Sequence, residues 1–184
     1  MTIQELHRFS DIHTHGHTAP DIVTSIEPHQ EMTGEYGKAW YSVGIHPWST
    51  SVPVDEHEFE LLRQMAADPR TVAIGECGFD RNRGGSADYQ RDIFLRHVDI
   101  SEIMEKPLVI HCVGRYGMLM DLHRELRPRQ LWIVHGFTGK PELARQLAAE
   151  GIAVSLGQRS RPEVADAVPQ ALLFHETDGL NNFS

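Results

Sequence analysis

Cysteine, long apolar runs and basic residues are all scarce in this sequence of 184 residues, and each scarcity excludes a class of protein. The two cysteines, Cys77 and Cys112, are too few for the disulfide framework of a small secreted protein and suit a reducing compartment. No apolar run approaches the roughly 20 residues of a membrane-spanning helix, and the first residues lack the basic and apolar regions of a signal peptide. The expected location is therefore the cytoplasm, with no membrane partner.

The charge balance limits the partners of the chain. A formal net charge of -9 disfavours a broad nucleic-acid-binding surface, because such surfaces neutralise phosphates with lysine and arginine. A small local site that handles phosphate through bound metal remains compatible with it. With 40% hydrophobic and 23% charged residues, and no repeat or linker, the sequence predicts a single domain over residues 1–184. Histidine is unusually frequent, with 12 copies, so the positions of the histidines decide the functional hypothesis.

Eight short apolar stretches predict strands, at residues 8–13, 21–26, 39–45, 71–76, 107–111, 131–135, 152–156 and 171–176. Near-continuous apolar runs of this kind are typical of parallel strands buried on both faces. Helical spacing of apolar residues follows at 55–67, 88–104, 116–126 and 141–150, and more weakly at 161–168. The alternation predicts an α/β fold, a compact (β/α)8 TIM-type barrel with a depleted outer helical ring. An open α/β sheet is the alternative, because the usual barrel has about 250 residues.

Strong metal ligands stand where these expected strands end. His13 and His15 lie two residues apart, so both point to one face of a strand, where Asp11 is placed to orient them. Taken alone, such a pair could be a chance arrangement on a polar loop. The pattern recurs near the ends of four further strands, at Glu76, His111, His135 and Asp178.

Parallel strands of a barrel bring these ligands to one face, where barrel enzymes carry their active sites. Six nitrogen and oxygen ligands can hold one or two divalent cations when a carboxylate is shared. Two cations about 3.5–4 Å apart can stabilise the attacking and leaving oxygens of a displacement at phosphorus. Imidazole and carboxylate admit magnesium, manganese, zinc or iron, so the metal stays open. Cys77 and Cys112 each follow a ligand by one residue, point the other way and are expected to pack in the core.

Taken in order, these motifs resemble the TatD family of metal-dependent deoxyribonucleases. The resemblance covers about residues 9–178 and rests on Asp-Ile-His-Thr-His at 11–15, Gly-Ile-His-Pro at 44–47, Ala-Ile-Gly-Glu-Cys-Gly-Phe-Asp at 73–80, Val-Ile-His-Cys at 109–112, Val-His-Gly-Phe-Thr-Gly at 134–139 and Glu-Thr-Asp at 176–178. The family usually places another histidine after Gly-Ile-His-Pro, and Trp48 stands there in this chain.

The resemblance implies a hydrolase barrel that cleaves phosphodiester bonds in DNA with one or two metal ions. It implies that His13 and His15 bind the first metal, that His111 and His135 bind the second, and that Glu76 bridges the two. Asp178 would bind metal and accept a proton from the attacking water, which makes Asp178 and Glu76 the candidate catalytic residues.

Four residues are candidates for substrate binding: His46, Arg81, Arg83 and Arg115. Arg81 and Arg83 follow Glu76 on the same barrel face, where a guanidinium fork suits phosphate oxygens, although a solvated loop is the alternative. His46 either touches substrate or stabilises the turn before Pro47. Arg115 takes the place of a basic residue that the family resemblance leads us to expect.

Three functions follow from these patterns. The first is a phosphodiesterase acting on DNA or a small nucleotide-like ester. The second is a hydrolase of a carboxylic ester, lactone or amide with the same metal site, because fold alone does not choose the substrate. The third is a non-catalytic metal-stabilised module, against which the presence of a candidate base, Asp178, argues.

The short connections between the first three expected strands leave little room for helices. Outward side chains near Val23, Ser42, Leu172 and Phe183 would then lie under thin cover. Contiguous apolar patches on soluble proteins usually mark an interface, which favours a homodimer. The alternative is that loops such as 28–38 fold back over this sector and the chain stays monomeric.

Overall fold

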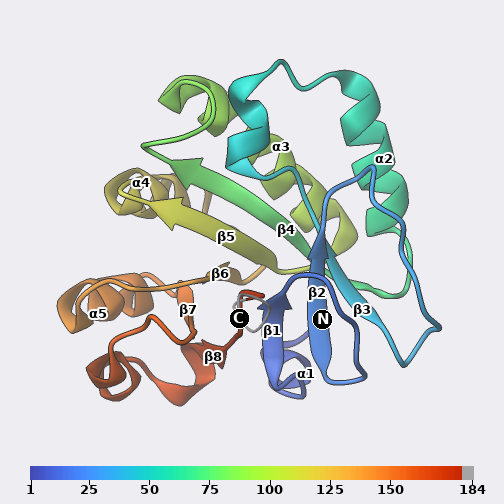
Figure 1. Cartoon of the computed structure of the whole chain (residues 1–184). Coiled ribbons are helices and arrows are strands. Elements are labelled where there is room, and N and C mark those ends of the chain that lie inside the picture. The colour runs from blue at the N-terminus through green and yellow to red at the C-terminus, as the bar shows by residue number, and fades with distance from the viewer. Residues whose placement is uncertain (180–184) are drawn as a thin grey trace.

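The computed structural model of the chain describes residues 1–179 and contains eight parallel strands in sequential order (Figure 1). They are β1 (Asp11–Thr14), β2 (Ile22–Ile26), β3 (Trp40–Val43), β4 (Thr71–Asp80), β5 (Leu108–Val113), β6 (Trp132–Val134), β7 (Ala153–Leu156) and β8 (Leu173–His175). Each strand pairs with the next along the chain. All eight predicted strands are therefore confirmed.

The sheet curves back on itself, so that the segment after β8 meets β1. The backbone N–H of Asp178 donates to the carbonyl of His13 at 3.1 Å. The hydroxyl of Thr177 donates to the carboxylate of Asp11 at 2.6 Å. This return produces a nearly closed barrel, which confirms the TIM-type prediction and rules out the open sheet.

Four helices pack around β3 to β7: α2 (Glu56–Ala66), α3 (Ala87–Met104), α4 (Tyr116–Leu126) and α5 (Pro141–Ala149) (Figure 1). Each lies where helical spacing predicted it. In α2 the side chain of Asp55 caps the first turn by accepting from the N–H of Glu58. The apolar residues Phe59 and Leu62, spaced as in a helix, form its buried face. The weak helix expected at 161–168 is a 3-10 helix, η2 (Pro162–Ala167).

Three short elements were not predicted: α1 (Ile3–Leu6), η1 (Pro47–Ser51) and η3 (Gln170–Leu172). Thr2 and Glu5 stabilise α1 through a reciprocal capping box. Leu6 and Phe9 then join a cluster of buried side chains from seven strands, at Ile12, Val23, Trp40, Val72, Ile133, Ala153 and Phe174. This cluster fills the floor of the barrel and leaves the carboxyl ends of the strands for the site.

Two strands run further than predicted. β4 continues to Asp80 and β5 to Val113, because their ladder pairs Gly78 with His111 and Asp80 with Val113. Glu76 and His111 therefore lie within strands instead of ending them. The β4–β5 ladder continues past both ligands, pairing Cys77 with Ile110 and Phe79 with Cys112, and so holds them more firmly than a strand end would.

The sector from β1 to β3 lacks helices, as the depleted ring predicts: the described residues between these strands form loops. The thin cover expected over Val23 and Ser42 is nevertheless wrong, since they are 1% and 0% exposed. Val23 belongs to the barrel floor. Tyr41 and Val43 pack in the larger hydrophobic cluster between the strands and the helices (the outer core), which includes Phe59 and Phe94, so Ser42 between them faces inward.

The loop before β3 also covers part of this sector, because the Tyr41 hydroxyl donates to the carbonyl of Thr33. Leu172 is half-buried against both clusters, and Phe183 lies outside the described residues. The homodimer therefore stays a prediction, with two of its four supporting residues removed by their burial. None of the helices within residues 1–179 has the length and apolar content that a bilayer crossing requires.

Candidate metal centre

The carboxyl ends of the strands surround a cavity of about 800 Å³. Its wall includes five of the six predicted ligands: His15, Glu76, His111, His135 and Asp178. The sixth, His13, is fully buried directly beneath, with its Nε2 atom 3.3 Å from Glu76 Oε2. The structure therefore brings all six predicted ligands together at one place.

Glu76 lies at the centre of this group. Its Oε1 atom is 2.6 Å from His135 Nε2, 2.9 Å from His111 Nδ1 and 2.9 Å from His46 Nε2. Its Oε2 atom faces the other pair, His13 Nε2 at 3.3 Å and His15 Nε2 at 3.7 Å. The two carboxylate oxygens thus divide the five imidazoles into two groups, which is the arrangement that a bridging carboxylate requires.

Strand packing fixes the position of Glu76. Gly75, the residue before it, has a φ of +133°, and a Cβ atom there would lie 2.2 Å from the carbonyl oxygen of Val109 on β5. Only glycine tolerates both this conformation and this close approach of two strands. The side chain of Glu76 is thereby held in the barrel mouth by backbone geometry.

Electrostatics keep this carboxyl ionised. Burial by itself would raise the pKa of Glu76, but the charges of His135 and His13 outweigh burial and hold the pKa well below its usual value. Burial would likewise lower the pKa of His135, yet Glu76 and Glu176 raise it well above its usual value. The raised pKa of His135 favours its protonated form, and binding of a metal ion there would displace that proton.

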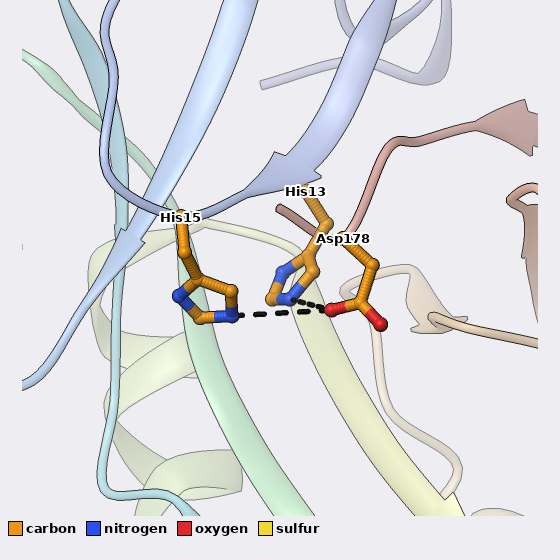
Figure 2. A group of neighbouring side chains, drawn as sticks. All are labelled: His13, His15 and Asp178. Atoms are coloured by element: carbon orange, nitrogen blue, oxygen red, sulfur yellow. Dashed lines mark ion pairs between the residues drawn. The ribbon is translucent and has the colours of Figure 1, made fainter. Parts of the chain in front are cut away.

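The first group of ligands comes from the two edges of the barrel (Figure 2). His13 projects from β1, His15 from the segment after it, and Asp178 from the segment after β8. Asp178 Oδ1 lies 3.7 Å from His13 Nε2 and 4.0 Å from His15 Nε2. These three side chains each offer one ligand atom within 4.8 Å of the other two.

The second group includes His46, which sequence analysis assigned to substrate or to a turn. His46 does cap η1, because its Nδ1 atom accepts from the N–H of Trp48 at 3.0 Å. Its Nε2 atom is nevertheless directed at Glu76, and the ligand atoms of His46, Glu76 and His111 lie within 4.8 Å of one another. His46 is therefore a candidate ligand for the second cation as well as a turn residue.

The residues present fit a divalent cation. Both ring nitrogens of His13, Nδ1 of His135 and Oε2 of Glu176 are buried and make no hydrogen bond among residues 1–179. Buried polar atoms are normally paired, because leaving one unpaired costs about 1–3 kcal/mol. His13 Nε2, unpaired and 3.3 Å from Glu76 Oε2, is suited to coordinate zinc, manganese, iron or magnesium together with that carboxylate.

Three predicted substrate residues lie away from the cavity wall. Arg81, Arg83 and Arg115 do not line it, whereas His46 does. The Arg81 stem packs beside Gly114, and Arg115 precedes the first turn of α4. The guanidinium of Arg83 lies 4.2 Å from the ring centroid of Trp48, which does line the cavity.

Sequence analysis missed four polar residues at the site. Asp80 Oδ2 lies 3.2 Å from His111 Nε2 and could have been found, since it is four residues beyond Glu76 on the same face of β4. Glu176 accepts from the N–H of Gly136 at 2.7 Å. Glu27 accepts from the N–H of His46 at 3.2 Å. Arg159 binds Asp178 Oδ2 at 3.1 Å, and no pattern marked it because the loop after β7 decides where it lies.

Asp11 contacts backbone and hydroxyl groups, whereas the sequence predicted that it would orient the imidazoles of His13 and His15. Its Oδ1 atom accepts from the backbone N–H of His13 at 3.0 Å, and its Oδ2 atom accepts from the Thr177 hydroxyl. Asp11 therefore fixes the backbone of β1 against the segment after β8 instead of orienting an imidazole. Cys77 and Cys112 are unpaired and buried in the outer core, as predicted, and burial raises the pKa of both thiols.

Fold and site together define a parallel β/α barrel with a candidate divalent-metal centre at the carboxyl ends of its strands. Comparison with known proteins gives the same class. Residues 10–180 match the model of the family described as TatD related DNase. The chain is 30% identical over 166 residues to the 3'-5' ssDNA/RNA exonuclease TatD of Escherichia coli (strain K12), covering 81% of this chain and 61% of that one. The chain therefore belongs to the TatD family of metal-dependent hydrolases.

Other relatives agree with this assignment. The metal-dependent hydrolase YabD of Bacillus subtilis is 26% identical over 157 residues, covering 80% of this chain and 61% of YabD. The chain thus spans about three fifths of the length of these relatives.

Two crystal structures share the fold. The TatD homologue YjjV of Escherichia coli superposes with a TM-score of 0.69 at 19% identity, covering 85% of this chain and 66% of YjjV. A TatD family hydrolase from Entamoeba histolytica superposes with a TM-score of 0.66 at 21% identity, covering 85% and 60%.

Proposed function

We propose that this chain is a metal-dependent phosphodiesterase that hydrolyses ester bonds in DNA or a small nucleotide-like substrate. The observation that carries the proposal is the position of Glu76, whose two oxygens face two separate groups of imidazoles. Such a carboxylate can hold two cations side by side, the arrangement that stabilises both oxygens of a displacement at phosphorus. The names of the Escherichia coli relative and of the matched family support the same chemistry.

The side chains of the site would have two roles, metal binding and proton transfer. His13, His15 and Asp178 would hold one cation, His111 and His135 with His46 the other, and Glu76 would join them. When bound, the cations supply an acidified water and neutralise charge on the phosphate oxygens. Asp178 would accept the proton of the attacking water: its Oδ1 atom faces His13 Nε2 at 3.7 Å, so Oδ2, which Arg159 contacts at 3.1 Å, is the oxygen left to take the proton.

The experiment uses chelated protein reconstituted with magnesium, manganese or zinc and tests phosphodiesters, carboxylic esters, lactones and amides. We expect metal-dependent hydrolysis of phosphodiesters, which His13→Ala abolishes. His57→Ala is the matched control, since the His57 side chain is 71% exposed on α2 and outside the cavity. Turnover confined to carboxylic esters, lactones or amides would overturn the phosphodiesterase, and metal binding without any turnover would indicate a non-catalytic module.

A further inference from the structure

An exposed tryptophan stands at the wall of the candidate metal cavity. Trp48 is 43% exposed and lines the cavity, whereas the other two tryptophans, Trp40 and Trp132, are 7% and 0% exposed. Core packing therefore accounts for Trp40 and Trp132 but not for Trp48. A large exposed ring at the wall of a cavity that also carries titratable side chains is a feature of ligand-binding sites.

The ring of Trp48 is held in place by the site itself. Its Nε1–H donates to Asp80 Oδ2 at 2.7 Å, and the same oxygen lies 3.2 Å from His111 Nε2. The ring also makes edge contacts with His46 and His111, at centroid distances of 4.7 and 5.9 Å. A ligand group resting on this ring would therefore sit directly beside the second group of candidate metal ligands.

Arg83 adds a cation to this ring. Its guanidinium lies 4.2 Å from the ring centroid, and no carboxylate among residues 1–179 forms an ion pair with it. Arg159 is the one lysine or arginine of the described cavity wall, and its guanidinium is bound to Asp178. With a net charge of -9, the chain offers few contacts to a long phosphate backbone. A ligand that complements the Trp48 ring and the Arg83 guanidinium carries both an aromatic ring and a negative charge.

We propose that Trp48 and Arg83 form the site that binds the nucleobase next to the scissile phosphate. Successive bases of single strands stack on aromatic rings and on arginine planes, whereas a paired base is not free to do so. The site then selects unpaired, base-bearing phosphodiesters and binds mainly through a base instead of through many phosphates. This inference rests on the proposed function, because it names what that hydrolase recognises.

Binding is measured first in metal-free protein by tryptophan fluorescence. A dinucleotide should quench the emission of Trp48, and a dinucleotide analogue with an abasic sugar in place of each nucleoside should not. Trp48→Leu should remove the quenching. Equal quenching by the two ligands, or none by either, contradicts the proposal.

Kinetics with the reconstituted enzyme separate recognition from structure. Trp48→Leu should lower kcat/KM for the dinucleotide about 10-fold more than kcat/KM for the abasic analogue, with the difference carried by KM. Trp48→Phe keeps a ring but loses the Nε1–H, so its KM for the dinucleotide should lie between those of the wild-type enzyme and Trp48→Leu. Tyr36→Leu is the matched control, because Tyr36 is 67% exposed and outside the cavity wall.

The outcomes distinguish this inference from the proposed function. Equal losses on both substrates would mean that Trp48 acts only through Asp80 on the metal ligands, which overturns base recognition. Equal hydrolysis of the dinucleotide and the abasic analogue by the wild-type enzyme would support a phosphodiesterase but reject recognition of the base. Base-dependent quenching without hydrolysis of any phosphodiester rejects the phosphodiesterase and keeps Trp48 as a base-binding residue.

Discussion

The carboxylate of Glu76 and the imidazole of His135 face each other in the barrel mouth, with 2.6 Å between Oε1 and Nε2. Both side chains are almost fully buried, and His46 and His111 approach the same oxygen. A buried ion pair of this kind is weak evidence for stability, because desolvation offsets the attraction between the charges. The cluster is better explained by the cations that its atoms can coordinate.

Replacing Asp178 by asparagine should preserve the fold and remove most hydrolytic activity. The amide keeps the shape of the side chain and can still contact Arg159, but it cannot accept a proton from water. Loss of a positioned general base typically lowers the rate about 10²–10⁴-fold. Steady-state kinetics and metal analysis of Asp178→Asn check this, and near-normal turnover with normal metal content would reject the role.

A buried histidine outside the metal cluster should make stability depend on pH. His97 on α3 is fully buried; its Nδ1–H donates to the carbonyl of Ile93 at 2.8 Å, and its Nε2 accepts from the N–H of Ile45 at 2.9 Å. Burial lowers its pKa to about 4, below the value of about 6.5 in an unfolded chain. The unfolded chain therefore binds a proton first as the pH falls.

The stabilisation by neutral His97 is complete above about pH 6.5 and is lost as the pH falls towards 4, by about 3 kcal/mol in total. Urea unfolding from pH 7 to pH 4 measures this. His97→Gln can make both hydrogen bonds without titrating, so its free energy of unfolding should fall less steeply over this range. Parallel pH profiles for the two proteins would show that His97 does not contribute.

Gly75 should tolerate no side chain. Gly75→Ala combines an unfavourable φ of +133° with a Cβ atom 2.2 Å from the Val109 carbonyl oxygen, so β4 and β5 must separate beside Glu76. We expect a loss of at least about 1–3 kcal/mol in unfolding free energy, together with weaker metal binding. Gly117→Ala is the control, because a Cβ at Gly117 on α4 meets nothing within 4 Å and alanine favours helix. Equal stability of the two variants would refute this account of Gly75.

The oligomeric state is a separate prediction. The sequence favours a homodimer, but burial of Val23 and Ser42 within one chain removes two of the four residues on which that expectation rested. Light scattering at micromolar concentration decides between the two states. A mass near 20.8 kDa, unchanged on dilution, would exclude the dimer, and a mass near twice that value would support it.

The residues that could be predicted from the sequence are those whose position follows from strand periodicity. Glu76, His111 and His135 each follow an apolar run, and parallel strands must bring such residues to one face. Asp80 obeys the same rule, but the predicted strand ended too early because Gly78 and Asp80 are poor strand formers in isolation. The ladder to β5 overrides that preference.

Loop residues could not be predicted in this way. Arg159 reaches Asp178, and Arg83 reaches Trp48, through loop conformations that no periodicity encodes. The double contact of His46, with the N–H of Trp48 through Nδ1 and with Glu76 through Nε2, depends on the turn at η1 in the same way. The turn role that the sequence offered for this histidine is therefore present, whereas its contact with Glu76 was not among the possibilities.

Metal content measures the central claim most directly. Chelated protein is reconstituted with a divalent cation, dialysed and analysed for bound metal per chain, alongside His13→Ala, His111→Ala and the exposed-histidine control His57→Ala. We predict two ions per chain, or one firmly bound and one weaker, with a loss in each of the first two variants and none in the control. Unchanged metal content in both His13→Ala and His111→Ala would contradict the assignment of the site.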